Sequence, residues 1–112
     1  MADPARQDPK AAPSRARIPI DREKIAAFCR RHGIRKLSLF GSVLRDDFRP
    51  DSDVDVLVEF QPGRTPGLAF FAMERELSEA LGRRVDLNTE GFLSRRFREE
   101  VVLEAEPLYD AA

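Results

Sequence analysis

The segment DVDVLV, residues 53–58, restricts the fold more than any other part of the chain. Its period-two alternation and its β-branched residues predict a strand that runs to Phe60. Successive side chains of a strand point to opposite faces, so the three valines are expected to enter a core while Asp53 and Asp55 share the other face. The chain therefore has to build a sheet and bring two carboxylates together on one side of it.

Helical and extended patterns alternate along the rest of the chain. A helix is predicted from an N-cap at Asp21 to a stop at Gly33, and a second one over residues 69–81, ending at Gly82. A third helix is predicted over residues 92–105, with Leu93, Phe97 and Val101 facing inward. Further strands are expected over residues 34–40 and 84–87, with an extended edge at residues 108–109; residues 43–52 form a short helix or a loop, and residues 61–67 a loop.

This order predicts a small α/β (α+β) fold, a mixed sheet covered by helices on one side. The length of 112 residues fits one domain, expected over residues 19–112. Residues 1–18 contain three prolines among small and polar residues and are expected to form a flexible tail. No apolar stretch suggests a membrane span or a signal peptide, so a cytoplasmic location is expected.

Charge and the rarer residues exclude several classes of protein. With 19 basic and 20 acidic residues the net charge is −1, so no overall positive field would hold long nucleic acid. Cys29 is the single cysteine and is expected to pack in the core. His32 is the single histidine, predicted at the surface at a helix end, which leaves no His-rich metal site. Any anion that this chain binds therefore has to be held by individual groups at its binding site, not by the overall charge.

The paired carboxylates predict a metal site. Two like charges held close together repel each other unless a cation lies between them. Mg²⁺ is the natural cation, because it is usually held by one or two carboxylates together with water and substrate phosphates. Asp86, on the short strand predicted next, is a third carboxylate able to reach the same point, as a base and second-metal ligand. A nucleoside triphosphate would complete the coordination.

Gly41 and Ser42 follow the first predicted strand, and ten residues separate Ser42 from Asp53. A glycine there lets phosphates approach the backbone, and the Ser42 hydroxyl can donate to a phosphate oxygen. Both groups also have an ordinary interpretation, because Gly-Ser and Asp-Ser-Asp are common turn residues. The spacing favours phosphates at Gly41 and a metal at Asp53 and Asp55.

With these motifs, the chain resembles the minimal nucleotidyltransferases of the DNA polymerase beta superfamily, which have a polymerase beta-like palm fold. The matching pieces are LFGSVLR ending at Arg45, SDVDVLV at 52–58, ELSEALGRRVDL at 76–87 and EAEPLYD at 104–110. The resemblance implies that Gly41 and Ser42 hold a triphosphate and that Asp53, Asp55 and Asp86 complete a Mg²⁺ site.

The family resemblance also implies a reaction and a partner. The acceptor hydroxyl would attack the α-phosphate of ATP, with two metal ions, and AMP would be transferred. Minimal members act as antitoxins that attach AMP to a tyrosine of a HEPN ribonuclease toxin, so the resemblance implies a hetero-oligomer with such a toxin.

Several alternatives stay open at this stage. Arg45 suits a phosphate contact, or an ion pair with Asp46 or Asp47. The arginines Arg95, Arg96 and Arg98 suit a partner, a nucleotide or a solvated helix face. The whole chain could also inhibit its partner by occlusion alone, without catalysis. A metal-dependent glycosyltransferase with an Asp-x-Asp motif is disfavoured by the short chain and by the preceding Gly-Ser.

Overall fold

A computed structural model describes residues 16–93 and 95–111. Its first helix, α1 (Arg22–His32), begins and ends where the sequence predicts. The Asp21 side chain accepts a hydrogen bond from the Lys24 N–H at 3.2 Å, which caps the helix start. Gly33 has a φ of 69°, and its N–H donates to the Cys29 carbonyl, which closes the last turn in the left-handed conformation that glycine favours.

Four strands form one mixed sheet. They are β1 (Ile34–Phe40), β2 (Val54–Phe60), β3 (Val85–Asn88) and β4 (Glu106–Asp110), in the spatial order β3-β2-β1-β4. β1 is antiparallel to β2 and β4, whereas β2 and β3 are parallel. The mixed sheet confirms the predicted class. The C-terminal segment, predicted as a few extended residues, is a full edge strand.

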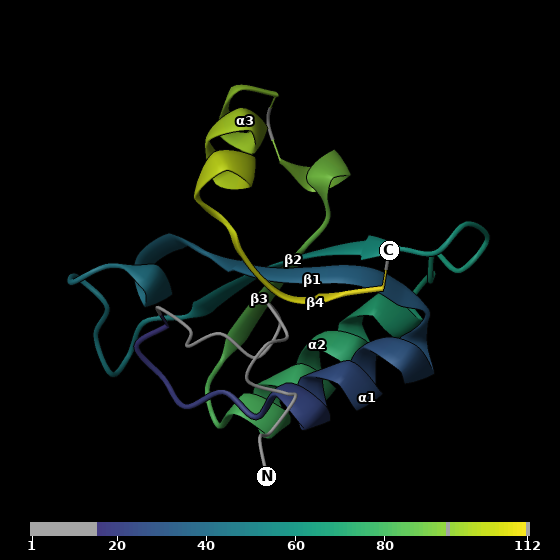
Figure 1. Cartoon of the computed structure of the whole chain (residues 1–112), viewed down its shortest axis with the longest axis horizontal. Helices are drawn as coiled ribbons and strands as arrows, with labels where there is room; N and C mark the ends of the chain where they lie inside the picture. The colour runs from purple at the N-terminus through teal and green to yellow at the C-terminus, as the bar shows by residue number, and fades with distance from the viewer. Residues whose placement is uncertain (1–15, 94, 112) are drawn as a thin grey trace, which may run out of the picture.

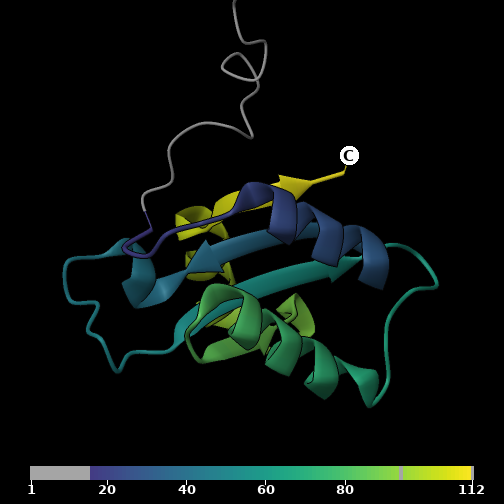
Figure 2. The same cartoon turned by 90° about the horizontal axis from the view of Figure 1, so that it is seen from below.

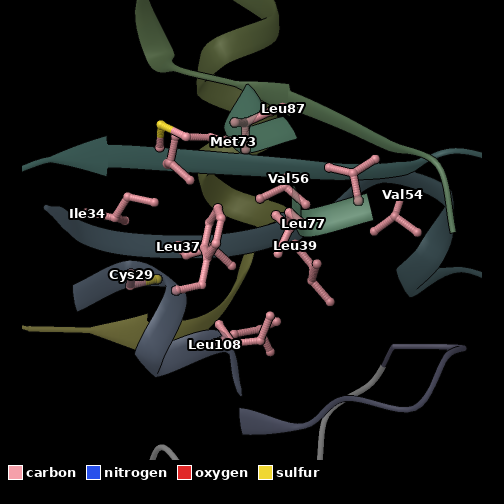
Figure 3. Close-up of a cluster of buried hydrophobic side chains, with 14 of the residues drawn as sticks. Cys29, Ile34, Leu37, Leu39, Val54, Val56, Met73, Leu77, Leu87 and Leu108 are labelled. Atoms are coloured by element: carbon pink, nitrogen blue, oxygen red, sulfur yellow. The ribbon is translucent and has the colours of Figure 1, made fainter. Parts of the chain in front are cut away.

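Helices α1 and α2 (Ala69–Leu81) lie side by side on one face of the sheet (Figures 1 and 2). α2 connects the parallel strands β2 and β3, as a crossover between parallel strands requires. Figure 3 shows side chains of both helices and of all four strands meeting in the main core beneath them. Cys29 is buried there, and burial raises the pKa of its thiol to about 12, which confirms a packing role.

The third helix, α3 (Arg95–Glu104), lies on the opposite face of the sheet from α1 and α2 (Figure 1). It is preceded by a 3-10 turn, η4 (Glu90–Phe92). A second, smaller cluster there joins Phe40 and Leu57 of the sheet to Leu93 and Val101. Helices therefore cover parts of both faces, not one. The reason is that Phe40 and Leu57 are apolar residues on the carboxylate face.

Three details of the expected pattern are wrong. Phe97 was expected to face inward, but it remains 48% exposed at the margin of the second cluster, edge-on to Phe40. His32 is 24% exposed and not a free surface residue, because its ring packs on Phe28 and its Nε2 lies 2.9 Å from a carboxylate oxygen of Glu76. Ile18, placed in the tail, is buried in the main core.

Residues 17 and 18 therefore pack against the domain expected from residue 19 onward. The Arg17 N–H donates to the Val43 carbonyl at 2.9 Å, which holds this segment against the turn after β1. Residues 1–15 of the predicted tail lie outside the described part of the chain. None of the helices in the described part is long and apolar enough to cross a membrane.

Leu77 of α2 is completely buried, whereas Leu103 of α3 is 88% exposed. We expect Leu77→Ala to lower the free energy of unfolding by about 3 kcal/mol, because it leaves a cavity between α2 and the sheet. Leu103→Ala should change it by less than about 0.5 kcal/mol. Urea denaturation of both variants measures the difference, and similar losses would contradict the assignment of the core.

Candidate active site

The three predicted carboxylates gather at neighbouring positions of β2 and β3. Asp53 immediately precedes β2, Asp55 is its second residue, and Asp55 is paired in register with Asp86 of β3. The flanking residues Val54 and Val85 are buried in the main core under α1 and α2. By alternation, Asp53, Asp55 and Asp86 lie on the other face of the sheet, as the sequence predicts for the first two.

Gly41 lies directly against Asp55. β1 is antiparallel to β2 with Phe40 opposite Asp55, so the residue after β1 falls beside this carboxylate. Gly41 has a φ of 81°, and a Cβ added to it would overlap the Oδ2 of Asp55. Glycine is therefore required here for two reasons. It adopts the left-handed backbone conformation readily, and it has no Cβ to overlap the Asp55 carboxylate.

Ser42 belongs to a single 3-10 turn, η3 (Gly41–Leu44), and not to a longer helix. Its carbonyl accepts the Arg45 N–H at 2.8 Å, which closes the turn, and its side chain is partly exposed. One turn carries little dipole, so a phosphate at this place would depend on individual backbone N–H groups and on the Ser42 hydroxyl.

The surroundings of Asp55 shift the pKa of its carboxyl group. Its pKa is raised to about 6, chiefly by burial and also by the nearby charges of Asp86, Asp53 and Glu104, while Arg45 opposes the shift. An ionised Asp55 is therefore unfavourable unless a cation compensates for it.

The donor set fits a hard cation that brings part of its own coordination. Carboxylate oxygens at Asp53 and Asp55 are the ligands that Mg²⁺ takes, and Asp86 adds an exposed third. In the described part of the chain, no three His, Cys, Asp or Glu side chains converge closely enough to enclose a metal by themselves. Phosphate oxygens and water would have to supply the remaining ligands, as is usual for Mg²⁺.

Arg45 is engaged with a residue that the sequence did not indicate. Its Nη1 donates to Glu104 Oε2 at 2.6 Å, and its Nε lies 3.6 Å from Asp47 Oδ1. Asp46, the other acid considered for Arg45, pairs with Arg17. Glu104 Oε1 also accepts the Gly41 N–H at 3.1 Å. Glu104 is 63 residues from Gly41, and no periodicity links the two, so only the fold could reveal it.

Two more residues that the sequence did not indicate, Arg83 and Arg84, lie around the loop that leads into Asp53. A hollow of about 470 Å³ is lined by residues 50–53 and 82–84. Arg84 Nε lies 3.8 Å from Asp53 Oδ1, and Arg83 donates to the carbonyls of Arg49 and Pro50. These contacts tie the loop that leads into Asp53 to the turn between α2 and β3.

Of the three arginines considered on α3, the structure describes the side chain of Arg98 alone. Arg98 is partly buried and donates to the Leu93 carbonyl at 3.5 Å, so it is not on a fully solvated face. The side chains of Arg95 and Arg96 lie outside the described part.

Sequence comparisons relate most of the chain to known proteins. Residues 22–109 match the family model described as "Nucleotidyltransferase domain". A Methanocaldococcus jannaschii protein provisionally named as a protein adenylyltransferase is 33% identical over 84 residues, or 75% of this chain and 89% of that protein. The protein adenylyltransferase MntA of Thermococcus cleftensis is 45% identical over 58 residues, or 51% of this chain and 57% of that protein.

Solved structures share the fold. One, provisionally identified as a minimal nucleotidyltransferase, is 45% identical with a TM-score of 0.66 and covers 78% of this chain and 88% of its own. A toxin-antitoxin structure with AMP-PNP has a TM-score of 0.67 at 24% identity, covering 81% and 74%. The complex of an MNT antitoxin with the tri-AMPylated HEPN toxin of Shewanella oneidensis has 0.60 at 24%, covering 80% and 69%. Because the last two structures are only 24% identical to this chain, their similarity shows a shared fold and nothing more. The predicted nucleotidyltransferase fold is confirmed.

Gly41→Ala should destabilise the chain by about 2–4 kcal/mol, because it combines left-handed backbone strain with an overlap against Asp55. Gly63→Ala is the matched control: Gly63 has a φ of 77° with no atom within 4 Å of an added Cβ, so strain alone applies. Urea denaturation measures both. In an Asp55→Ala background the loss for Gly41→Ala should fall to that of the control. An unchanged loss would contradict the proposed contact.

Asp55→Asn should stabilise the metal-free chain at pH 8. The pKa of Asp55 in the folded chain is about 6 against 3.8 in the unfolded chain, so ionisation opposes folding above pH 6 and less so as the pH falls toward 3.8. After allowance for solvent screening we expect a gain of about 1–2 kcal/mol at pH 8 and a smaller one at pH 4.5. Thermal unfolding in EDTA measures both values. Equal gains at the two pH values would show that charge is not the cause.

Proposed function

This chain belongs to the nucleotidyltransferase domain family, and we propose that it is a protein adenylyltransferase that transfers AMP from ATP to a hydroxyl group of a partner protein. The partner is a HEPN ribonuclease toxin, the acceptor is a tyrosine, and the transfer neutralises the toxin. The chain is then the antitoxin of a hetero-oligomer. Support comes from the adenylyltransferase names of its relatives and from the AMPylated toxin bound to an antitoxin of this fold.

One observation carries the proposal. β2 holds Asp55 in register with Asp86 on one side and against Gly41 on the other, so the carboxylates and the turn that begins at Gly41 adjoin at one end of the sheet. A site that only binds a partner does not need a left-handed glycine packed on a half-buried acid.

Each residue then has a role in phosphoryl transfer. Asp53 and Asp55 would hold Mg²⁺, and the Gly41 N–H, the Ser42 hydroxyl and Arg45 would bind phosphate oxygens. When bound, Mg²⁺ would neutralise charge on the triphosphate and on the leaving pyrophosphate. An ATP analogue occupies a toxin-antitoxin structure of this fold, which supports ATP as the donor.

The proposed step is an in-line displacement. The acceptor oxygen forms a bond to the α-phosphorus while the bond to the β-phosphate oxygen breaks, and pyrophosphate leaves. Asp86, exposed beside Asp55, takes the proton of the acceptor hydroxyl. Because ATP and the RNA that a ribonuclease would cleave are cytoplasmic, the proposal places the reaction in the cytoplasm.

The test is transfer from α-labelled ATP to the purified HEPN toxin in the presence of Mg²⁺. Asp53→Asn and Asp55→Asn should each reduce labelling by roughly hundredfold or more, because the metal would lose a charged ligand. Glu79→Gln is the matched control, since Glu79 is exposed on α2, under the other face of the sheet, and should label at the native rate.

Undiminished labelling by both asparagine variants would overturn the assigned site. Toxin inhibition should be measured in parallel by its ribonuclease activity. If no label is transferred and the toxin is nevertheless inhibited by the native chain and by both variants, the alternative holds: a catalytically silent antitoxin that acts by occlusion.

A further inference from the structure

Glu104 occupies the proposed phosphate site with its own carboxylate. Oε1 accepts the Gly41 N–H at 3.1 Å and Oε2 accepts from Arg45 Nη1 at 2.6 Å, so its two oxygens span two donors that the proposed function gives to the triphosphate. The Glu104 side chain is 33% exposed, so it is partly solvated in this position.

The position of Glu104 is determined by the fold on both sides of it. It is the last residue of α3, which is held to the sheet by Val101 and by Leu93 just before the helix. Two residues later the chain is paired with β1, because Glu106 lies opposite Leu39. The end of α3 is thereby placed over the beginning of η3. The contact is therefore no chance approach of a surface side chain.

Negative charge is unusually concentrated around Asp55 and Gly41. Asp53 and Asp86 lie near enough to Asp55 for their charges to raise its pKa, and Glu104 adds a fourth carboxylate that acts in the same direction. A carboxylate is stable there because Arg45 and a backbone N–H compensate for it. One N–H cannot serve Glu104 and a phosphate oxygen in the same geometry, so nucleotide and Glu104 compete.

We propose that Glu104 is a built-in competitor of the nucleotide phosphates: it holds Gly41 and Arg45 in the free chain and has to leave them when a triphosphate binds. This inference rests on the proposed function, since it concerns the same site. Its consequence is that Glu104 lowers the affinity for nucleotide while keeping the turn and Arg45 arranged to receive it.

The test measures the dissociation constant of AMP-PNP, in the presence of Mg²⁺, by isothermal titration calorimetry on the full chain. Glu104→Gln keeps an oxygen that can accept the Gly41 N–H but removes the negative charge, so AMP-PNP should bind about three- to tenfold more tightly. Glu100→Gln, which removes a charge from an exposed position one turn earlier on α3, should bind like the native chain. Equal or weaker binding by Glu104→Gln would overturn the inference.

A measurement on the native chain needs no variant. The NMR signals of the Gly41 amide and of the Glu104 side-chain carboxyl should both shift as AMP-PNP saturates the site. A Glu104 carboxyl signal that does not move at saturation would overturn the inference and leave the proposed function intact. If neither the native chain nor Glu104→Gln binds AMP-PNP, the proposed function fails, and the inference fails with it.

Discussion

The pairing of β2 with both of its neighbours is the interaction on which the site depends. The parallel ladder with β3 places Asp86 beside Asp55, and the antiparallel ladder with β1 brings the start of η3 to the same carboxylate. A shift of either register by one residue would turn every side chain of the strand to the other face. The buried valines of β2 oppose such a shift, because it would expose them, so the same residues that stabilise the core also align the acids.

Stability and function oppose each other at this point. Asp55 is partly buried among three other carboxylates, and Gly41 adopts a left-handed conformation pressed against it. Like-charge repulsion around a partly buried acid persists only where the surrounding structure enforces it, and it is often found at functional sites. Here the main core under α1 and α2 holds β1 and β2 together while the opposite face carries the unfavourable charges.

α3 covers only part of that opposite face, and this determines how accessible the acids are. α3 packs on it through a small cluster at Phe40 and Leu57, which leaves the acids accessible at the end of the sheet. The same helix delivers Glu104 to Gly41 and Arg45. One short helix thus completes the second side of the sheet and places an anion among the groups assigned to phosphate.

Local sequence determined most of the elements and the identity of the acids. Helix caps at Asp21 and Gly33, the alternation of residues 53–58 and the Gly-Ser turn are local signals, readable because side-chain spacing and backbone preference act over a few residues. The resemblance to a family supplied the roles of the acids. Neither source could reveal that Ile18 is buried, that α3 lies on the carboxylate face or that Glu104 binds Gly41 and Arg45. Those outcomes depend on contacts across 26 to 63 residues of chain, from Arg17 with Val43 to Gly41 with Glu104, and only the tertiary structure decides such contacts.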